Sequence, residues 1–102
     1  MNFQSALEHA NGDVFAAIVV FHTARSYRPF AATRQELYVA AWLKNYRTAP
    51  ERVPGEVKRV APLLRELGIA IEETVGVKDK AAWVFSLTAG SPLLPDPGPV
   101  AA

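Results

Sequence analysis

Residues 54–87 constrain the fold more than any other stretch of the chain. A segment with the apolar spacing of a helix stops at Gly68 and is followed by two segments of alternating apolar residues. The apolar positions of the first segment recur at i, i+3, i+4, i+7 and i+10: Val57, Val60, Ala61, Leu64 and Leu67. This spacing places them on one buried face of a helix. Pro54 suits the first helical turn, and Gly68 suits termination in the left-handed conformation. We predict a helix over residues 54–67 that leads directly into a β-ribbon.

The other side of this predicted helix is basic, with little bulk near its start. It consists of Gly55, Lys58, Arg59, Pro62, Arg65 and Glu66. Pro62 removes a backbone donor, and its ring crowds the carbonyl of Lys58, which costs roughly 3 kcal/mol in a helix interior. The apolar spacing nevertheless continues in phase across Pro62. We therefore expect the helix to be kinked or split at this proline.

Two strands are predicted between residues 69 and 87. Apolar residues occupy every second position in both segments: Ile69, Ile71, Trp83, Phe85 and Leu87. Each strand can therefore present one apolar face at a period of two. The turn between them, residues 76–80, contains a glycine and charged residues but lacks the Asn-Gly signature of a tight hairpin. The prediction is a two-stranded wing with Lys78 and Lys80 at its tip.

Length and composition exclude several classes of protein. With 102 residues and half of them hydrophobic, the chain can form one domain with its own core. The absence of cysteine excludes disulfides, thiolate catalysis and cysteine-ligated zinc. The longest strongly apolar run, Val14 to Phe21, is far shorter than the roughly 20 residues that span a bilayer. No basic segment precedes it as in a secretory signal, so we expect a soluble, cytoplasmic protein without membrane association.

The net charge of +1 is distributed unevenly along the chain. From Arg25 to Arg65 there are nine basic residues and three glutamates, a local balance of +6. The first 24 residues carry −2 and the last 37 carry −3. Such asymmetry is typical of a protein with one basic face.

The N-terminal third contains two candidate helices. Residues 2–11 can form a short helix that is opened by Asn2 and ended by Gly12. Asp13 is a candidate N-cap for a helix over residues 14–25. The β-branched run from Ile18 to Val20 would equally suit a buried strand, so helix and strand both remain open for residues 14–21. As a helix, this segment would be apolar around much of its circumference, which suits a central core element or half of a dimer interface.

The middle of the chain carries the clearest local signal. Residues 26–32 contain Pro29, which biases the residue before it away from helix, and we predict a connection there. Thr33 and Glu36 then match a capping box. The helix that they open, residues 34–47, has apolar residues on two sides, and we expect it to be deeply embedded. Its aromatic residues Tyr38, Trp42 and Tyr46 recur every four positions, which favours a core stripe over a base-stacking platform.

The C-terminal segment changes in composition. Residues 88–102 contain four prolines and two glycines and show no periodicity. We predict a domain over residues 1–87 followed by a disordered tail over residues 88–102, which could be a linker to something larger.

From Thr33 to Leu87 the chain resembles the winged helix-turn-helix superfamily. The resemblance rests on the order of a capped helix, a turn, a helix, a strand, a basic turn and a strand with a tryptophan. RVAPLLRELGI is similar to the recognition helix and first wing strand of many bacterial and phage DNA-binding domains. AAWLKNY followed by LLRELG is also similar to the accessory winged-helix domains of phage and plasmid primases and replication proteins. The resemblance implies a mainly helical α+β fold, with three or four helices and a two-stranded wing.

The resemblance also implies a set of DNA-binding residues. The second helix would lie in the major groove, with Arg52, Lys58 and Arg59 along it. Arg34 at the start of the preceding helix, together with Lys78 and Lys80 in the wing, would contact phosphates. Double-stranded DNA is the expected partner of a regulator or a replication module. The alternative is a winged-helix protein-interaction or dimerisation module, with a homodimer or a larger replication complex as the assembly.

Catalytic and metal-binding patterns receive no support from the sequence. His9 and His22 are far apart, and neither has a second histidine at helical spacing. No glycine-rich phosphate loop or nucleophile elbow occurs. We therefore expect no enzyme activity, no cofactor and no metal.

Overall fold

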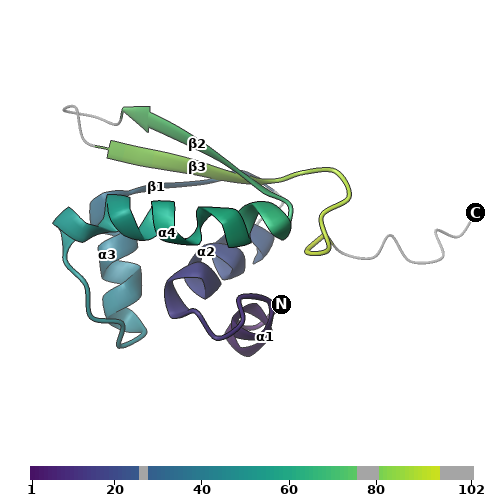
Figure 1. Ribbon diagram of the computed structural model, residues 1–102, viewed down its shortest axis with the longest axis horizontal. Helices are drawn as coiled ribbons and strands as arrows, with labels where there is room; N and C mark the ends of the chain where they lie inside the picture. The colour runs from purple at the N-terminus through teal and green to yellow at the C-terminus, as the bar shows by residue number, and fades with distance from the viewer. Residues whose placement is uncertain (26–27, 76–80, 95–102) are drawn as a thin grey trace, which may run out of the picture.

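A computed structural model describes residues 1–25, 28–75 and 81–94. It is a mainly helical α+β fold, with four α-helices and a three-stranded antiparallel sheet in the described part (Figure 1). The elements follow one another along the chain as α1 (Phe3–His9), α2 (Val14–Arg25), β1 (Phe30–Thr33), α3 (Arg34–Leu43), a 3₁₀ turn (Pro50–Arg52), α4 (Val53–Glu66), β2 (Ile69–Val75) and β3 (Ala81–Leu87).

Side-chain caps begin the first three helices where the sequence predicts them. The Asn2 side chain accepts a hydrogen bond from the Ser5 amide at 2.8 Å, and Asp13 Oδ1 accepts one from the Ala16 amide at 3.1 Å. The capping box of α3 is complete, because Thr33 and Glu36 each accept a hydrogen bond from the other's amide. Residues 14–25 are therefore helical, and α2 is the central core element, with seven buried residues.

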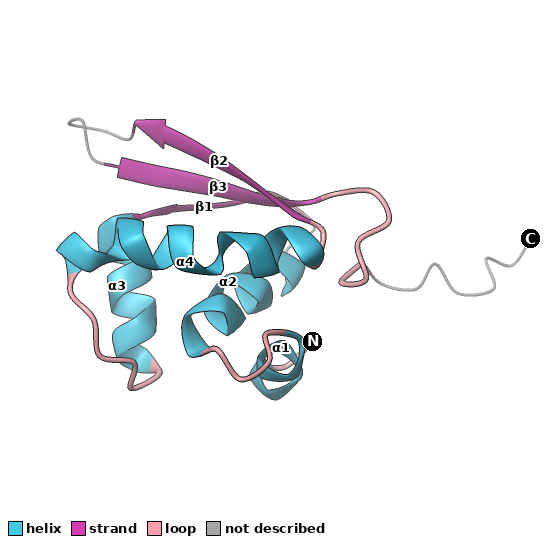
Figure 2. Cartoon of the chain, in the orientation of Figure 1, coloured by secondary structure: helices cyan, strands magenta, loops and turns pink. Residues whose placement is uncertain are grey.

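The helices cover one face of the sheet (Figure 2). The strand order is β1-β3-β2, and both pairs are antiparallel. Phe85 of the central strand is fully buried, opposite Phe30 of β1 and Ile71 of β2. The aromatic ring of Phe30 stacks on that of Phe85 with centroids 5.9 Å apart. This pairing places the core between the inner face of the sheet and helices α2 and α4.

Strand β1 corrects one prediction. Residues 26–32 were expected to be a connection, whereas Phe30–Thr33 pair with β3. The four residues are too few to give a convincing period-two pattern, and they carry only one large apolar side chain. Their strand conformation depends on the edge that β3 offers more than 45 residues later in the chain.

Helix α4 has the predicted face, and of the two outcomes expected at Pro62, a kink or a split, the split does not occur. It is assigned as one helix from Val53 to Glu66 with Pro62 inside, so the expectation of a split helix is wrong. Its buried side contains Val57, Val60, Ala61 and Leu64, and its exposed side contains Gly55, Lys58, Arg59, Pro62, Arg65 and Glu66. Pro62 lies on the exposed side, where water can solvate the carbonyl that it leaves unpaired. Burial of apolar side chains before and after Pro62 holds both halves of the helix against the core.

Helix α3 is not deeply embedded, which contradicts the sequence prediction. Leu37 and Ala41 are its buried residues. The exposed fractions are 45% for Val39, 53% for Trp42 and 73% for Leu43. The neighbouring elements contact one side of this helix, so apolar residues elsewhere on its circumference remain at the surface.

The aromatic stripe of residues 38, 42 and 46 is likewise only partly core. Tyr38 and Tyr46 pack against the core with partial burial. Trp42 is exposed, and the Arg47 guanidinium lies 4.7 Å from the centroid of its ring.

Residues 88–94 pack against the end of α4, whereas the sequence predicts a disordered tail from residue 88. Ser91 and Leu93 are both buried. Ser91 Oγ donates a hydrogen bond to the Leu67 carbonyl at 2.6 Å, and the Thr88 amide donates one to the Gly68 carbonyl at 2.8 Å. These bonds satisfy carbonyls at the end of α4 that have no partner within the helix. The rest of the predicted tail, residues 95–102, lies outside the described residues.

Candidate nucleic-acid interface

The exposed side of α4 presents a row of basic residues beside the sheet. Lys58 and Arg65 are seven positions apart, which is close to two helical turns, so they lie along the same side. Both side chains are exposed. Among the described residues, neither forms an ion pair with a carboxylate. Their charges are therefore available to an anionic partner.

A hollow of about 230 Å³ separates this row from the ribbon of β2 and β3. It is lined by Val57, Lys58, Ala61, Arg65, Ile71, Glu73 and Trp83. Trp83 is buried and stands opposite Glu73 in the strand register. The hollow thus combines an apolar floor with two cationic side chains and one carboxylate, and the Glu73 charge lowers the positive potential there.

Arg59 lies on the same helix but is engaged within the molecule. Its guanidinium forms an ion pair with Asp13, the N-cap of α2. It also donates to Glu56 Oε2 at 2.9 Å and to the Tyr46 hydroxyl at 3.3 Å. The Tyr46 hydroxyl in turn donates to Glu56 Oε2. This Arg59 cluster, formed by Asp13, Tyr46, Glu56 and Arg59, ties α4 to the start of α2 and to the loop after α3.

The pKa values of the cluster follow from these contacts. Partial burial on its own would raise the pKa of Asp13, but hydrogen bonds from Arg59 and from the Ala16 amide outweigh it, and the pKa falls below its ordinary value. Partial burial would also raise the pKa of Glu56, but hydrogen bonds from Arg59 and Tyr46 outweigh it. The pKa of Glu56 therefore also falls below its ordinary value. Hydrogen bonds to Asp13 and Glu56 raise the pKa of Arg59 further above its usual range. Burial and the bond to Glu56 raise the pKa of Tyr46. With two carboxylates and one guanidinium, the cluster carries a charge of −1 at neutral pH.

Removing the Arg59 guanidinium should destabilise the fold in a pH-dependent way. We expect Arg59→Met to lower the free energy of unfolding at pH 7 by about 0.5–1 kcal/mol, because the half-exposed side chain is screened by solvent. Because the pKa values of Asp13 and Glu56 are lowered in the folded state, this stabilisation is present above their unfolded values. It is lost as the pH falls through their folded values. Urea unfolding at pH 7 and pH 3 measures the difference.

Arg65→Met is the matched control for this prediction, since it removes an exposed guanidinium from the same helix without breaking an ion pair. Equal losses of unfolding free energy in the two variants, or a loss for Arg59→Met that is the same at both pH values, would contradict the assigned role of the cluster.

The remaining predicted DNA-binding residues are dispersed. Arg34 is the first residue of α3 and is partly buried. Arg52 is exposed and ends the 3₁₀ turn before α4. Lys78 and Lys80 lie outside the described residues. Of the predicted residues, Lys58 lies on the open basic row and Arg59 is bound within the cluster. Arg65 and Glu73, which were not among the predicted DNA-binding residues, also line the hollow.

The sequence indicates one of these two additional residues, Arg65, but not the other, Glu73. Arg65 lies seven positions after Lys58 on the predicted exposed face, so the helical spacing contains the signal for it. Glu73 has no such signal, because its place beside α4 depends on how the ribbon packs on the helix.

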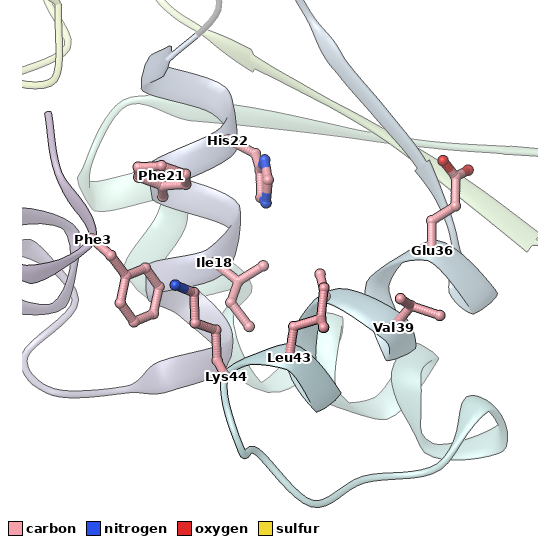
Figure 3. Close-up of a pocket in the computed structure, with 9 residues that line it drawn as sticks. Phe3, Ile18, Phe21, His22, Glu36, Val39, Leu43 and Lys44 are labelled. Atoms are coloured by element: carbon pink, nitrogen blue, oxygen red, sulfur yellow. The ribbon is translucent and has the colours of Figure 1, made fainter.

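A second and larger hollow, of about 370 Å³, lies among α1, α2 and α3 (Figure 3). Its lining comprises Phe3, Ile18, Phe21, His22, Glu36, Val39, Ala40, Leu43 and Lys44. The Lys44 ammonium is 4.3 Å from the centroid of the Phe3 ring. Burial, followed by the charges of Arg25 and Lys44, lowers the pKa of His22, so this imidazole is neutral at pH 7. The walls are therefore mainly apolar, with opposite charges at the two ends of α3.

The described residues contain no cluster of three or more His, Asp or Glu side chains arranged to hold a metal ion. None of the helices in residues 1–25, 28–75 and 81–94 is long and apolar enough to cross a membrane.

Comparisons of the chain with protein-family models, with curated proteins and with solved structures gave no match.

Proposed function

We propose that this chain is a winged-helix DNA-binding domain, which acts as a transcriptional regulator or as the DNA-docking module of a phage or plasmid replication protein. The succession of α3, a short connection, α4 and the β2–β3 ribbon supports this assignment. In this interpretation α4 is the recognition helix, and the ribbon is the wing beside it. Strand β1 adds a third strand to the wing sheet.

The exposed row on α4 is the observation that carries the proposal. Gly55, Lys58, Pro62 and Arg65 follow one another along the side of the helix that faces solvent. Nothing lies within 4 Å of the position that a Cβ on Gly55 would occupy, so a duplex can approach the start of the row closely. The helix has 14 residues, and a helix of this kind fits a major groove about 12 Å wide. Lys58 and Arg65 would contact phosphates or guanine edges.

Arg59 takes a different part in this proposal from Lys58. Its guanidinium has two carboxylate partners, so its attraction for phosphate is largely offset. It would hold α4 at a fixed angle to α2, which determines how the basic row meets the duplex. Arg52 and Arg34 remain candidate phosphate contacts at the N-terminal ends of α4 and α3.

Fluorescence anisotropy with a labelled mixed-sequence duplex at two salt concentrations tests the proposal. We expect binding that weakens steeply with salt, because neutralised phosphates release counterions and log K falls with a slope of about −0.9 per contact. Reversing both charges of the row, Lys58→Glu with Arg65→Glu, should weaken binding at least tenfold and reduce the slope by about two contacts.

A matched variant distinguishes the effect of the basic row on affinity from the effect of net charge alone. Arg25→Glu with Arg47→Glu changes the net charge by the same amount at exposed positions outside α4. We expect its loss of affinity to be much smaller. If the two double variants bind equally weakly, α4 is not the recognition helix, and if the unaltered protein does not bind at low salt, the DNA-binding proposal fails.

The exposed apolar side of α3 favours a second candidate function, a winged-helix module for protein interaction. Val39, Trp42 and Leu43 leave large apolar areas in water, which is typical of contact surfaces between proteins. In that case the duplex titration would show no salt-dependent binding, whereas the protein would associate through α3.

A further inference from the structure

We infer that two copies of this chain associate through α3, helix against helix and antiparallel. The inference is independent of the proposed DNA binding, because the contact uses α3 and the hollow beside it, whereas the proposed interface uses α4.

The exposed apolar side chains of the described residues are concentrated on α3. Five large hydrophobic side chains are exposed in the described part of the chain: Met1, Val39, Trp42, Leu43 and Leu94. Three of the five belong to α3, at positions i, i+3 and i+4, which lie together on one side of a helix. Tryptophan is also among the residues that contribute most to binding at protein interfaces. A continuous apolar stripe therefore runs along the solvent side of this helix.

The stripe continues into the larger hollow. Val39, Ala40 and Leu43 form one wall of the hollow, and Phe3, Ile18 and Phe21 line its other side. Figure 3 shows Val39 and Leu43 of α3 on one side of the hollow, and Phe3 of α1 with Ile18 and Phe21 of α2 on the other side. A helix placed against α3 can therefore also fill the hollow with its own apolar side chains.

Charges at the two ends of α3 make this surface complementary to itself. Glu36 lies in the first turn, and Lys44 is the C-cap. Both line the hollow, so they lie toward the same lateral edge of the helix, about 12 Å apart along its axis. In an isologous contact, the same surface of both copies meets across a two-fold axis. If this axis lies in the plane of the contact and is perpendicular to α3, it reverses the direction of the helix. The edge of α3 that carries Glu36 and Lys44 then lies on the same side of the contact in both copies. Glu36 of each copy then meets Lys44 of the second copy.

The local bonding of both charged groups permits this pairing. Glu36 uses Oε1 to accept the Thr33 amide at 3.1 Å, which leaves Oε2 as an acceptor for an ammonium group. Lys44 lies against the Phe3 ring at the edge of the hollow, and among the described residues it forms no ion pair. An antiparallel arrangement also aligns the two helix dipoles favourably. A parallel two-fold arrangement would instead place the charged edges of the two copies on opposite sides of the contact, where Glu36 and Lys44 cannot pair. The self-complementarity of the antiparallel arrangement favours a second copy of the chain over an unrelated partner.

Sedimentation velocity of the full chain without DNA, over a range from micromolar to hundreds of micromolar protein, tests the inference. We expect a concentration-dependent monomer–dimer equilibrium. Leu43→Asp should weaken the association at least tenfold, because it replaces the most exposed residue of the apolar stripe with a carboxylate. Leu94→Asp is the matched control, since Leu94 is also exposed but lies outside α3, and we expect it to dimerise as the unaltered protein does.

A charge exchange tests the antiparallel pairing itself. Glu36→Lys alone places two lysines at each pair, and Lys44→Glu alone places two glutamates there, so each variant alone should dimerise at least tenfold more weakly. An equimolar mixture should restore dimerisation, because both pairs are then oppositely charged. Circular dichroism confirms that each variant is folded, since Glu36→Lys also removes the capping box.

Three outcomes would overturn the inference. The first is a monomer throughout the concentration range, in which case a small apolar molecule or a different protein would have to occupy the hollow. The second is a dimer that Leu43→Asp does not weaken, which would place the contact on another surface. The third is a mixture of the two charge variants that associates no better than either variant alone.

Discussion

Replacing Gly68 with alanine is expected to lower the free energy of unfolding by about 3 kcal/mol or more, which combines the strain of a left-handed backbone with a steric overlap. Gly68 has a φ of +76°, and a Cβ built on it would lie 2.5 Å from Ser91 Cβ and 2.7 Å from Ser91 Cα. Ser91 cannot move away easily, because its hydroxyl donates to the Leu67 carbonyl and the Thr88 amide donates to the Gly68 carbonyl. Urea unfolding followed by circular dichroism measures the loss.

Gly90→Ala is the matched control for this overlap. Gly90 has a similar φ of +83°, but nothing lies within 4 Å of the Cβ position. Its substitution should therefore lose only the backbone term, about 1 kcal/mol. If the two variants lose the same free energy, then residues 88–94 do not pack against the end of α4 as described.

Leu37→Ala is expected to lower the free energy of unfolding by about 2–5 kcal/mol, because it leaves a cavity in the core. Leu37 is 1% exposed, whereas Leu43, on the same helix, is 73% exposed. The same substitution at Leu43 should change the free energy of unfolding by no more than about 0.5 kcal/mol, as is usual for surface positions. Thermal and urea unfolding should both be followed at low micromolar protein, where dimerisation through α3 contributes least.

This pair of leucine variants decides how α3 lies on the core. The embedded helix expected from the sequence would give large losses at both positions. A large loss at Leu37 alone matches a helix that is buried on one side and open on the other.

The parts of the fold that the sequence determined are those whose causes lie within a few residues. The Thr33–Glu36 capping box joins residues three positions apart, and it begins α3 as predicted. The apolar spacing from Val57 to Leu64 determined both the buried and the exposed side of α4. The alternation in residues 69–87 likewise predicted β2 and β3. Because a residue's neighbours at i+2, i+3 and i+4 follow from the backbone period alone, these patterns can be read without knowing the fold.

The candidate site was predictable only in part for the same reason. Lys58 and Arg65 were already on the predicted exposed face of the helix over residues 54–67. The ion pair of Arg59 with Asp13 could not be predicted, because Asp13 is 46 positions away in the chain. Glu73 lines the hollow because the ribbon packs on α4.

Tertiary structure alone decided three further features: the pairing of β1, the open side of α3 and the packing of residues 88–94. Strand β1 exists because β3 offers it an edge. The apolar residues of α3 are buried or exposed according to which side α2 and α4 contact, which the composition of the helix does not specify. Ser91 is held by the carbonyl of Leu67 at the end of a helix 24 positions earlier. Each of these outcomes depends on groups distant in sequence, which only the folded chain brings together.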